Sequence, residues 1–65
     1  MTFRVQFDID NDAFVSDPVS EAARILAEVR ARILREGTLP THALTIFDSN
    51  GNDVGRFKLY TESRP

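Results

Sequence analysis

The chain has 65 residues, with eight basic and ten acidic side chains, one histidine and no cysteine, so its formal net charge is −2. This length suits a single domain, and a domain of this size buries only ~60% of the surface that its unfolded chain exposes. The lack of cysteine excludes disulfides, thiolate metal sites and a cysteine nucleophile, and a hydrophobic content of 42% argues against disorder.

The first predicted element is a strand over about residues 2–9. Apolar residues occupy every second position from Phe3 to Ile9, and polar residues lie between them. A period of two is typical of a strand that buries one face. The run from Asp10 to Asp12 ends the pattern, because short polar side chains favour turns.

A helix is predicted over about residues 18–36. Asp17 can cap its first N–H groups, and Pro18 suits its first position because the missing N–H has no partner there. The stripe expected to face the sheet comprises Val19, Ala22, Ala23, Leu26, Val29, Ile33 and Leu34, with Ile25 at its margin. On the charged side, Glu28 and Arg32 have the spacing of an ion pair. Gly37 suits the residue that ends the helix.

A hairpin is predicted over about residues 43–60, followed by a flexible polar tail over residues 61–65. Asn50-Gly51 is the strongest short hairpin signal, and as a two-residue loop it sets Phe47 opposite Val54. The inner face of the hairpin then carries Leu44, Ile46, Phe57 and Leu59. The outer face carries Thr45, Phe47, Val54, Arg56, Lys58 and Tyr60.

The order of these elements is β-α-β-β, which predicts one small domain over residues 1–65 with a two-layer α+β fold. One amphipathic helix packs on a three-stranded, mainly antiparallel sheet. The last strand is expected in the middle, because it is the longest and that place makes both its neighbours antiparallel. The expected core comprises Phe3, Val5, Phe7, Leu26, Val29, Ile33, Leu44, Ile46, Phe57 and Leu59.

The residue pattern predicts neither an enzyme nor a cofactor or metal site. The alternating aspartates of residues 8–12 resemble the start of a calcium loop, but Ala13 and Val19 stand where that loop needs Gly and Glu. His42 is the only histidine, and no serine lies in a G-x-S-x-G setting. The three glycines are isolated, so no phosphate-binding loop is predicted.

Two surfaces are candidates for binding a partner. The first is an acidic edge made by Asp8, Asp10 and Asp12, since residues 1–17 carry four anions, Asp17 included, and one cation. Such an edge can engage a basic groove on another protein, or it can serve solubility alone. The second is the outer sheet face, where Phe47, Val54 and Tyr60 predict a contact patch or a homodimer interface.

Two other partner classes are disfavoured by the sequence. The net charge and the absence of a basic patch argue against direct binding of nucleic acid. No apolar run approaches the ~20 residues that span a bilayer, and no signal peptide is apparent, so a cytoplasmic location is expected.

Several segments together resemble a known class of proteins. These are the F-x-V-x-F-D-I-D strand of residues 3–10, the run Asn11-Asp12-Ala13-Phe14, the helical segment of residues 21–26 and the hairpin segment of residues 48–55. Over nearly its full length the chain resembles the short β-α-β-β proteins encoded by tailed phages and prophages, most of which have no assigned role.

The resemblance implies a non-enzymatic protein of the bacterial host cytoplasm. Because some small acidic phage proteins are anti-CRISPR or other anti-defence inhibitors, the implied partner is a host protein or ribonucleoprotein defence complex. The alternative is a structural or regulatory phage protein that works as a homo-oligomer and has no host target. The resemblance supplies no site residues.

Overall fold

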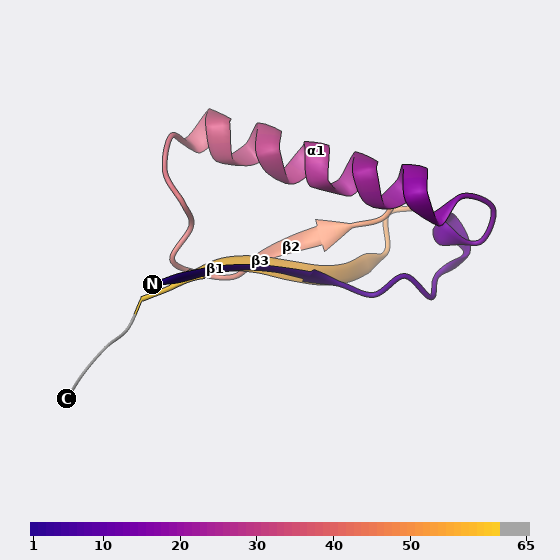
Figure 1. The fold of residues 1–65 in the computed structure, drawn as a ribbon, viewed down its shortest axis with the longest axis horizontal. Helices are drawn as coiled ribbons and strands as arrows, with labels where there is room; N and C mark the ends of the chain where they lie inside the picture. Colours follow the sequence, from indigo (N-terminus) through magenta and orange to yellow (C-terminus); the bar gives the residue numbers. More distant parts are fainter. Residues whose placement is uncertain (62–65) are drawn as a thin grey trace.

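The computed structural model describes residues 1–61 and confirms the two-layer α+β fold. Its elements are β1 (Thr2–Phe7), the short 3-10 helix η1 (Asp12–Phe14), α1 (Pro18–Glu36), β2 (Leu44–Phe47) and β3 (Asp53–Tyr60). Helix α1 runs along one face of the sheet (Figure 1). The strand order is β1-β3-β2 with both pairings antiparallel, so β3 is the middle strand as expected. Of the predicted tail, residues 62–65 lie outside the described residues.

Helix α1 has the range expected from the sequence, and its capping groups explain why. The Asp17 side chain accepts a hydrogen bond from the Ser20 N–H at 3.1 Å, and Pro18 opens the helix. At the other end Gly37 has a left-handed backbone with φ 76°, and its N–H donates to the Ile33 carbonyl at 2.9 Å. Both ends are therefore specified by local chemistry.

The connection from β1 to α1 differs from the prediction. Strand β1 ends at Phe7, so Ile9 lies outside the sheet with 55% of its surface exposed. The predicted turn contains η1, which was not expected, and η1 carries Phe14 into the core. The Phe14 ring stacks on Phe7 with centroids 6.3 Å apart. The contact between Phe7 of β1 and Phe14 therefore holds η1 against the sheet.

The hairpin turn is not the predicted two-residue loop. The Asp48 N–H donates to the Asn52 carbonyl, and the Gly51 N–H donates to the Asp48 carbonyl at 3.0 Å. Gly51 has φ 84°, but Asn50 does not have the positive φ that a type I′ turn needs. Three residues therefore separate the bonded pair, in the arrangement of a type I turn followed by a left-handed glycine.

A β-bulge follows the turn and corrects the register. Phe47 lies opposite Asp53 instead of Val54, and the register shifts between Ile46 and Phe47. The longer loop and the bulge cancel, so Ile46 lies opposite Gly55 as the two-residue loop predicted. Val54 is the extra residue of the bulge, which interrupts the in-and-out alternation of side chains. It is 7% exposed and belongs to the core, so its prediction as an outer-face contact residue is wrong.

The core is centred on a different side of α1 than predicted. Ile25, which was expected at the margin of the stripe, is 1% exposed, whereas Leu26 is 51% exposed and is not a core residue. The buried core comprises Phe14, Ile25, Val29, Ile46, Val54 and Phe57. Half-buried apolar residues pack against this core, among them Phe3, Val5, Phe7, Ile33 and Leu44. Leu59 is also half-buried. Among residues 1–61, no helix is long and apolar enough to cross a membrane.

Candidate functional site

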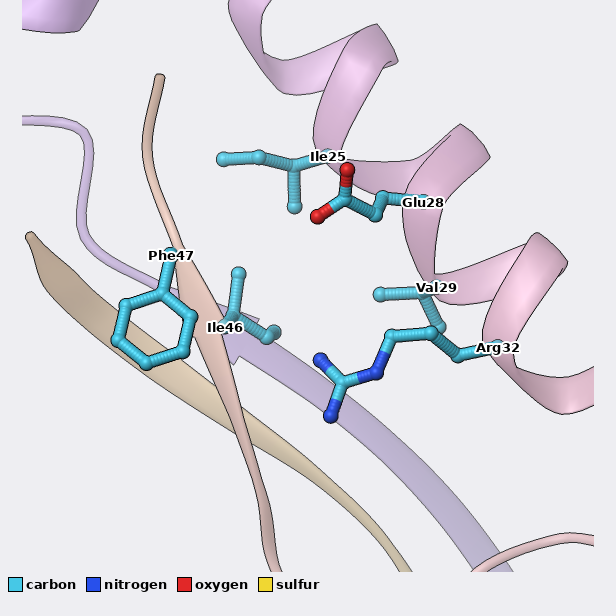
Figure 2. Close-up of a pocket in the computed structure, with 6 residues that line it drawn as sticks. All are labelled: Ile25, Glu28, Val29, Arg32, Ile46 and Phe47. Atoms are coloured by element: carbon cyan, nitrogen blue, oxygen red, sulfur yellow. The ribbon is translucent and has the colours of Figure 1, made fainter. Parts of the chain in front are cut away.

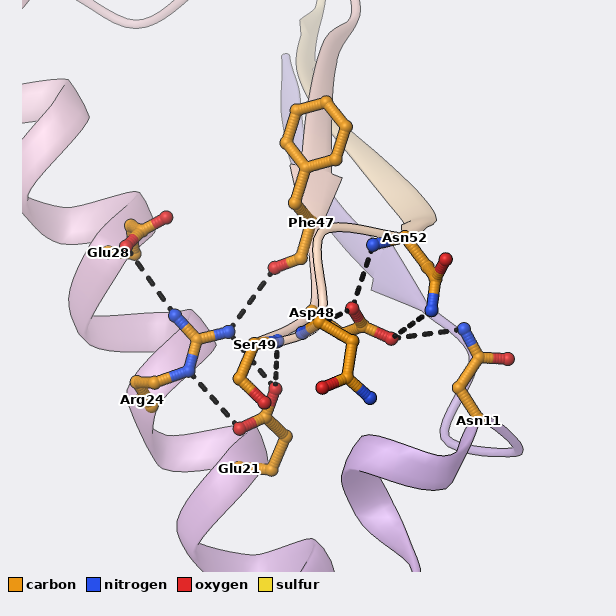
Figure 3. Close-up of polar contacts among 9 residues, drawn as sticks. Asn11, Glu21, Arg24, Glu28, Phe47, Asp48, Ser49 and Asn52 are labelled. Carbon is orange, nitrogen blue, oxygen red and sulfur yellow. Dashed lines mark hydrogen bonds and ion pairs between the residues drawn. The ribbon is translucent and has the colours of Figure 1, made fainter.

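Two loops that are distant in the sequence meet at one end of the molecule. The Asn11 side chain donates to Asp48 Oδ2 at 3.1 Å, which joins the segment before η1 to the β2–β3 turn (Figure 3). An open, polar hollow lies between the two loops. It is lined by Asp10, Asn11, Asp12, Asn50, Asn52 and Asp53. We call this surface the acidic end.

The acidic end contains part of the predicted acidic edge and one residue that was not predicted. Asp10 and Asp12 line the hollow, and Asp53 from the start of β3 joins them. Asp8 is exposed but lines a shallow depression with Gln6 and Arg56 instead. The contribution of Asp53 depends on the loop-to-loop contact, which no spacing in the sequence reveals.

Asp48 is the residue that holds the turn, and it is buried. Its Oδ1 accepts from the backbone N–H groups of Asn50 at 2.9 Å and Asn52 at 2.8 Å, and its Oδ2 accepts from the side chains of Asn11 and Asn52. Burial opposes ionisation, but these hydrogen bonds outweigh it and lower the pKa of Asp48. The side chain is therefore a structural anion that fixes the shape of the acidic end.

A second polar cluster ties α1 to the hairpin. Glu21 is an acidic residue in the first turn of α1, yet it is largely buried and accepts from the Ser49 N–H at 2.8 Å. Arg24 donates to both Glu21 oxygens and approaches Glu28 at 3.5 Å (Figure 3). The bond from Arg24, helped by the Ser49 N–H, lowers the pKa of Glu21. This cluster orients the turn relative to the helix.

The predicted ion pair between Glu28 and Arg32 does not form. Glu28 pairs with Arg24, and Arg32 instead donates to the Thr45 carbonyl of β2 at 2.7 Å. The Arg32 guanidinium also lies over the Phe57 ring, 5.0 Å from its centroid. Arg32, Ile25 and Val29 border a cavity of about 10 Å³ between α1 and β2, which is far too small for a ligand (Figure 2).

The predicted apolar patch on the outer sheet face loses Val54, and its other two residues lie far apart along the hairpin. Val54 is buried, and Phe47 borders the cavity beside α1 (Figure 2). Tyr60 lies at the far end of β3, seven residues beyond the partner of Phe47, which is about 23 Å along a strand. Phe47 and Tyr60 are exposed, but they lie at opposite ends of the hairpin.

The outer sheet face is instead basic and aromatic. Arg4 and Lys58 lie opposite each other in the sheet, and both approach the Tyr60 ring, at 5.1 and 4.9 Å from its centroid. Arg56 lies on the same strand face and pairs with Asp53 at 2.6 Å. The sequence interpretation missed this gathering because the cations come from two strands, and it becomes visible only when the register is known.

The remaining candidate residues do not assemble a reactive group in the described chain. Within residues 1–61, no cluster of three or more His, Asp or Glu side chains has an arrangement that could hold a metal ion. His42 is exposed beside Leu39 and Pro40, in the loop before β2. No family model, curated protein or solved structure matches this chain. Its function must therefore be argued from its own surfaces.

Proposed function

We propose that this protein acts by binding another protein, without catalysing a reaction, and that its target is a host defence complex of a phage-infected bacterium. The observation that carries the proposal is the acidic end. There the carboxylates of Asp10, Asp12 and Asp53 surround one open hollow, and within residues 1–61 neither Asp10 nor Asp12 forms an ion pair. The charges of Asp10 and Asp12 are therefore available to a partner, whereas Asp53 is paired with Arg56.

A groove that normally holds nucleic acid is a suitable partner for this surface. Such grooves are lined with Lys and Arg, and they attract an anionic protein over roughly one Debye length, ~8 Å at physiological salt. Complementary charge raises the rate of association more than it raises affinity. Single exposed pairs contribute only about 0–1 kcal/mol, so the surface acts as a group.

The class of target follows from the resemblance to short phage and prophage proteins. A CRISPR surveillance complex must expose a basic channel to its target DNA, and an acidic end seated in that channel would compete with the DNA. The proposed inhibitor therefore works by occupancy, acts in the bacterial cytoplasm and needs neither a cofactor nor contact with nucleic acid.

A plating assay tests this proposal. The chain is expressed in a strain whose CRISPR system targets a chosen phage, and we expect plaque formation to be restored. The double variant Asp10→Lys/Asp12→Lys should lose this effect. The matched control is Glu28→Lys/Glu36→Lys, which changes the net charge equally but lies on α1, away from the acidic end.

A competition assay with purified surveillance complex completes the test. The wild type should displace labelled target DNA, with an affinity that falls as salt rises. The proposal is wrong if the wild type neither restores plaques nor displaces DNA. The acidic end is only a solubility feature if the Asp10→Lys/Asp12→Lys variant works as well as the control.

A second candidate function is a structural or regulatory phage protein that acts as a homo-oligomer. The observation that favours it is the exposure of two apolar side chains on one flank of α1, Val19 and Leu26, which point in nearly the same direction from the helix axis. Exposed apolar side chains that share one flank of a helix favour contact with a partner. A protein that self-associates and leaves DNA binding by the surveillance complex unchanged would belong to this class.

A further inference from the structure

The two edges of the sheet differ in whether side chains of α1 bond to their outward backbone groups. At the edge of β2, Arg32 donates to the Thr45 carbonyl at 2.7 Å and Arg24 donates to the Phe47 carbonyl at 3.3 Å. These carbonyls point away from β3, since Leu44 and Ile46 are the alternate residues that face it. Two guanidinium groups of α1 thus occupy the acceptors that a further strand would need.

The edge of β1 has no such cover. The Asp8 N–H donates to the Val54 carbonyl at 2.9 Å and continues the register of Phe7 with Gly55. Because N–H and C=O groups alternate sides along an antiparallel strand, the groups of the odd-numbered residues Phe3, Val5 and Phe7 point outward. No partner for these outward groups is found among residues 1–61. This edge is open to strand addition.

The apolar flank of α1 lies on the same side as the open edge. Consecutive helical residues are about 100° apart around the helix axis, so the side chains of Arg24, Ile25 and Leu26 point in three different directions from that axis. Arg24 reaches the β2 edge and Ile25 enters the core, so Leu26 projects toward the β1 side. The exposed Val19 lies close to the same direction on the helix. The molecule therefore leaves both its unpaired strand and its apolar helix flank on one side.

We propose that β1 pairs antiparallel with β1 of a second copy, about a two-fold axis at Gln6. This register sets Arg4 opposite Asp8 of the second copy, and the symmetric contact repeats the pair. It also sets Val5 opposite Phe7 and Phe3 opposite Ile9, all on the helix side of the sheet. The result is one continuous sheet with a helix of each copy on the same face.

Other registers are less favourable. An axis at Arg4 would set the two Arg4 side chains directly opposite each other, and like charges in that position are destabilising. An axis at Val5 would set Asp8 opposite Thr2, so the charge of Asp8 would have no charged counterpart. The Gln6 axis explains why the apolar alternation continues to Ile9 although β1 ends at Phe7 and leaves Ile9 exposed.

A second copy is favoured over a strand from another protein because the complementarity lies within one segment, β1 together with the two residues that follow it. This segment supplies the cation, the anion and the apolar residues in a self-matching order. The two-fold axis also directs the apolar flanks of the two helices toward the same seam. This dimer does not use the charges of the acidic end, since Asp10 would face only Thr2 of the second copy and Asp12 lies beyond the paired segment.

Disulfide trapping tests the register. Gln6 would face Gln6 of the second copy as a non-hydrogen-bonded pair with Cα atoms about 4.5 Å apart, within the range for a disulfide. Since the natural chain has no cysteine, Gln6→Cys should form a covalent dimer under mild oxidation. The control is Arg56→Cys, which lies beside Gln6 on the same sheet face but one strand further from the edge. Equal cross-linking of both variants, or of neither, would overturn the proposal.

A charge swap tests it without cysteine. Arg4→Asp or Asp8→Arg alone should weaken the dimer at least tenfold in sedimentation equilibrium, and Arg4→Asp/Asp8→Arg should recover it. Circular dichroism checks that each variant folds. A wild type that stays monomeric, or a double variant as weak as the single ones, would contradict the dimer. So would a folded monomer that captures an unrelated strand peptide at this edge.

Discussion

Gly55 of β3 lies opposite Phe7 of β1, and the two strands approach each other closely there. A Cβ at this position would overlap the Gln6 carbonyl oxygen and would lie 2.6 Å from the Phe7 Cα, so a side chain meets backbone that cannot move aside. Overpacking of a core typically costs 1–3 kcal/mol, and a clash with backbone falls at the upper end or above. We expect Gly55→Ala to lower the free energy of unfolding by at least about 3 kcal/mol, measured by urea denaturation.

Gly37 provides the matched control for this substitution. Its φ of 76° strains an alanine, but no atom lies within 4 Å of the added Cβ. Gly37→Ala should therefore cost only about 1 kcal/mol. If the two alanine variants lose the same stability, close approach of the strands is not what requires Gly55.

Glu21 makes the stability of the protein sensitive to acid. The hydrogen bond from Arg24, supported by the Ser49 N–H, holds its pKa below the ordinary value of 4.5. A carboxylate with a lowered pKa in the folded state stabilises the protein above its unfolded pKa and loses this contribution as the pH falls. We expect the urea midpoint of the wild type to fall as the pH drops below about 4.5.

Glu21→Gln should remove part of this acid sensitivity, because the amide cannot titrate. It should also be less stable than the wild type at pH 7. Glu28→Gln is the control, since Glu28 is exposed and only approaches Arg24 at 3.5 Å. Identical pH profiles for the Glu21→Gln variant and the wild type would show that other groups cause the acid sensitivity, for example Asp48.

The rotation of α1 decides which of its apolar residues stabilise the fold. Ile25 is 1% exposed and Leu26 is 51% exposed, although the two are neighbours of similar size. Ile25→Ala should cost about 2–5 kcal/mol. Leu26→Ala should cost well below ~2 kcal/mol in the monomer. Chemical denaturation at low protein concentration measures both, and equal losses would mean that α1 is turned differently on the sheet.

Features specified by neighbouring residues were predictable from the sequence. The caps of α1 at Asp17 and Gly37, the alternation of β1 and the position of β3 in the sheet all follow from local chemistry or simple topology. The sequence interpretation failed where a group distant in the sequence determines how a residue is oriented or buried. Arg24 and Arg32 bond to the carbonyls at the edge of β2, and α1 buries Ile25 instead of Leu26, the residue that its periodicity predicts.

The candidate site was predictable only in part for the same reason. Asp10 and Asp12 are neighbours in sequence, so their proximity could be expected. Asp53 joins them through the contact of Asn11 with Asp48, and Val54 leaves the outer face through the bulge. Short-range patterns carry no information about either of these two effects.

At the scale of the whole molecule, one side is closed and the other is open. Helix α1 is bonded to β2 and its turn, while the inner face of β1 is only half-buried. A dimer that covers this side stabilises the folded state by mass action. We expect the melting temperature to rise with protein concentration, measured by calorimetry over a hundredfold range. A constant melting temperature would contradict association in this range.

The guanidinium groups of Arg24 and Arg32 also determine whether such an assembly stops growing. A sheet with two pairing edges can add copies at both and polymerise into a fibril, whereas a sheet with one blocked edge ends as a closed pair. Arg24→Ala/Arg32→Ala should therefore shift sedimenting species beyond the dimer and increase thioflavin binding, unless the variant unfolds, which circular dichroism would reveal. A folded variant that remains dimeric would contradict this role. Two arginines on a helix thus prevent further strands from being added at the β2 edge and limit the assembly to a dimer.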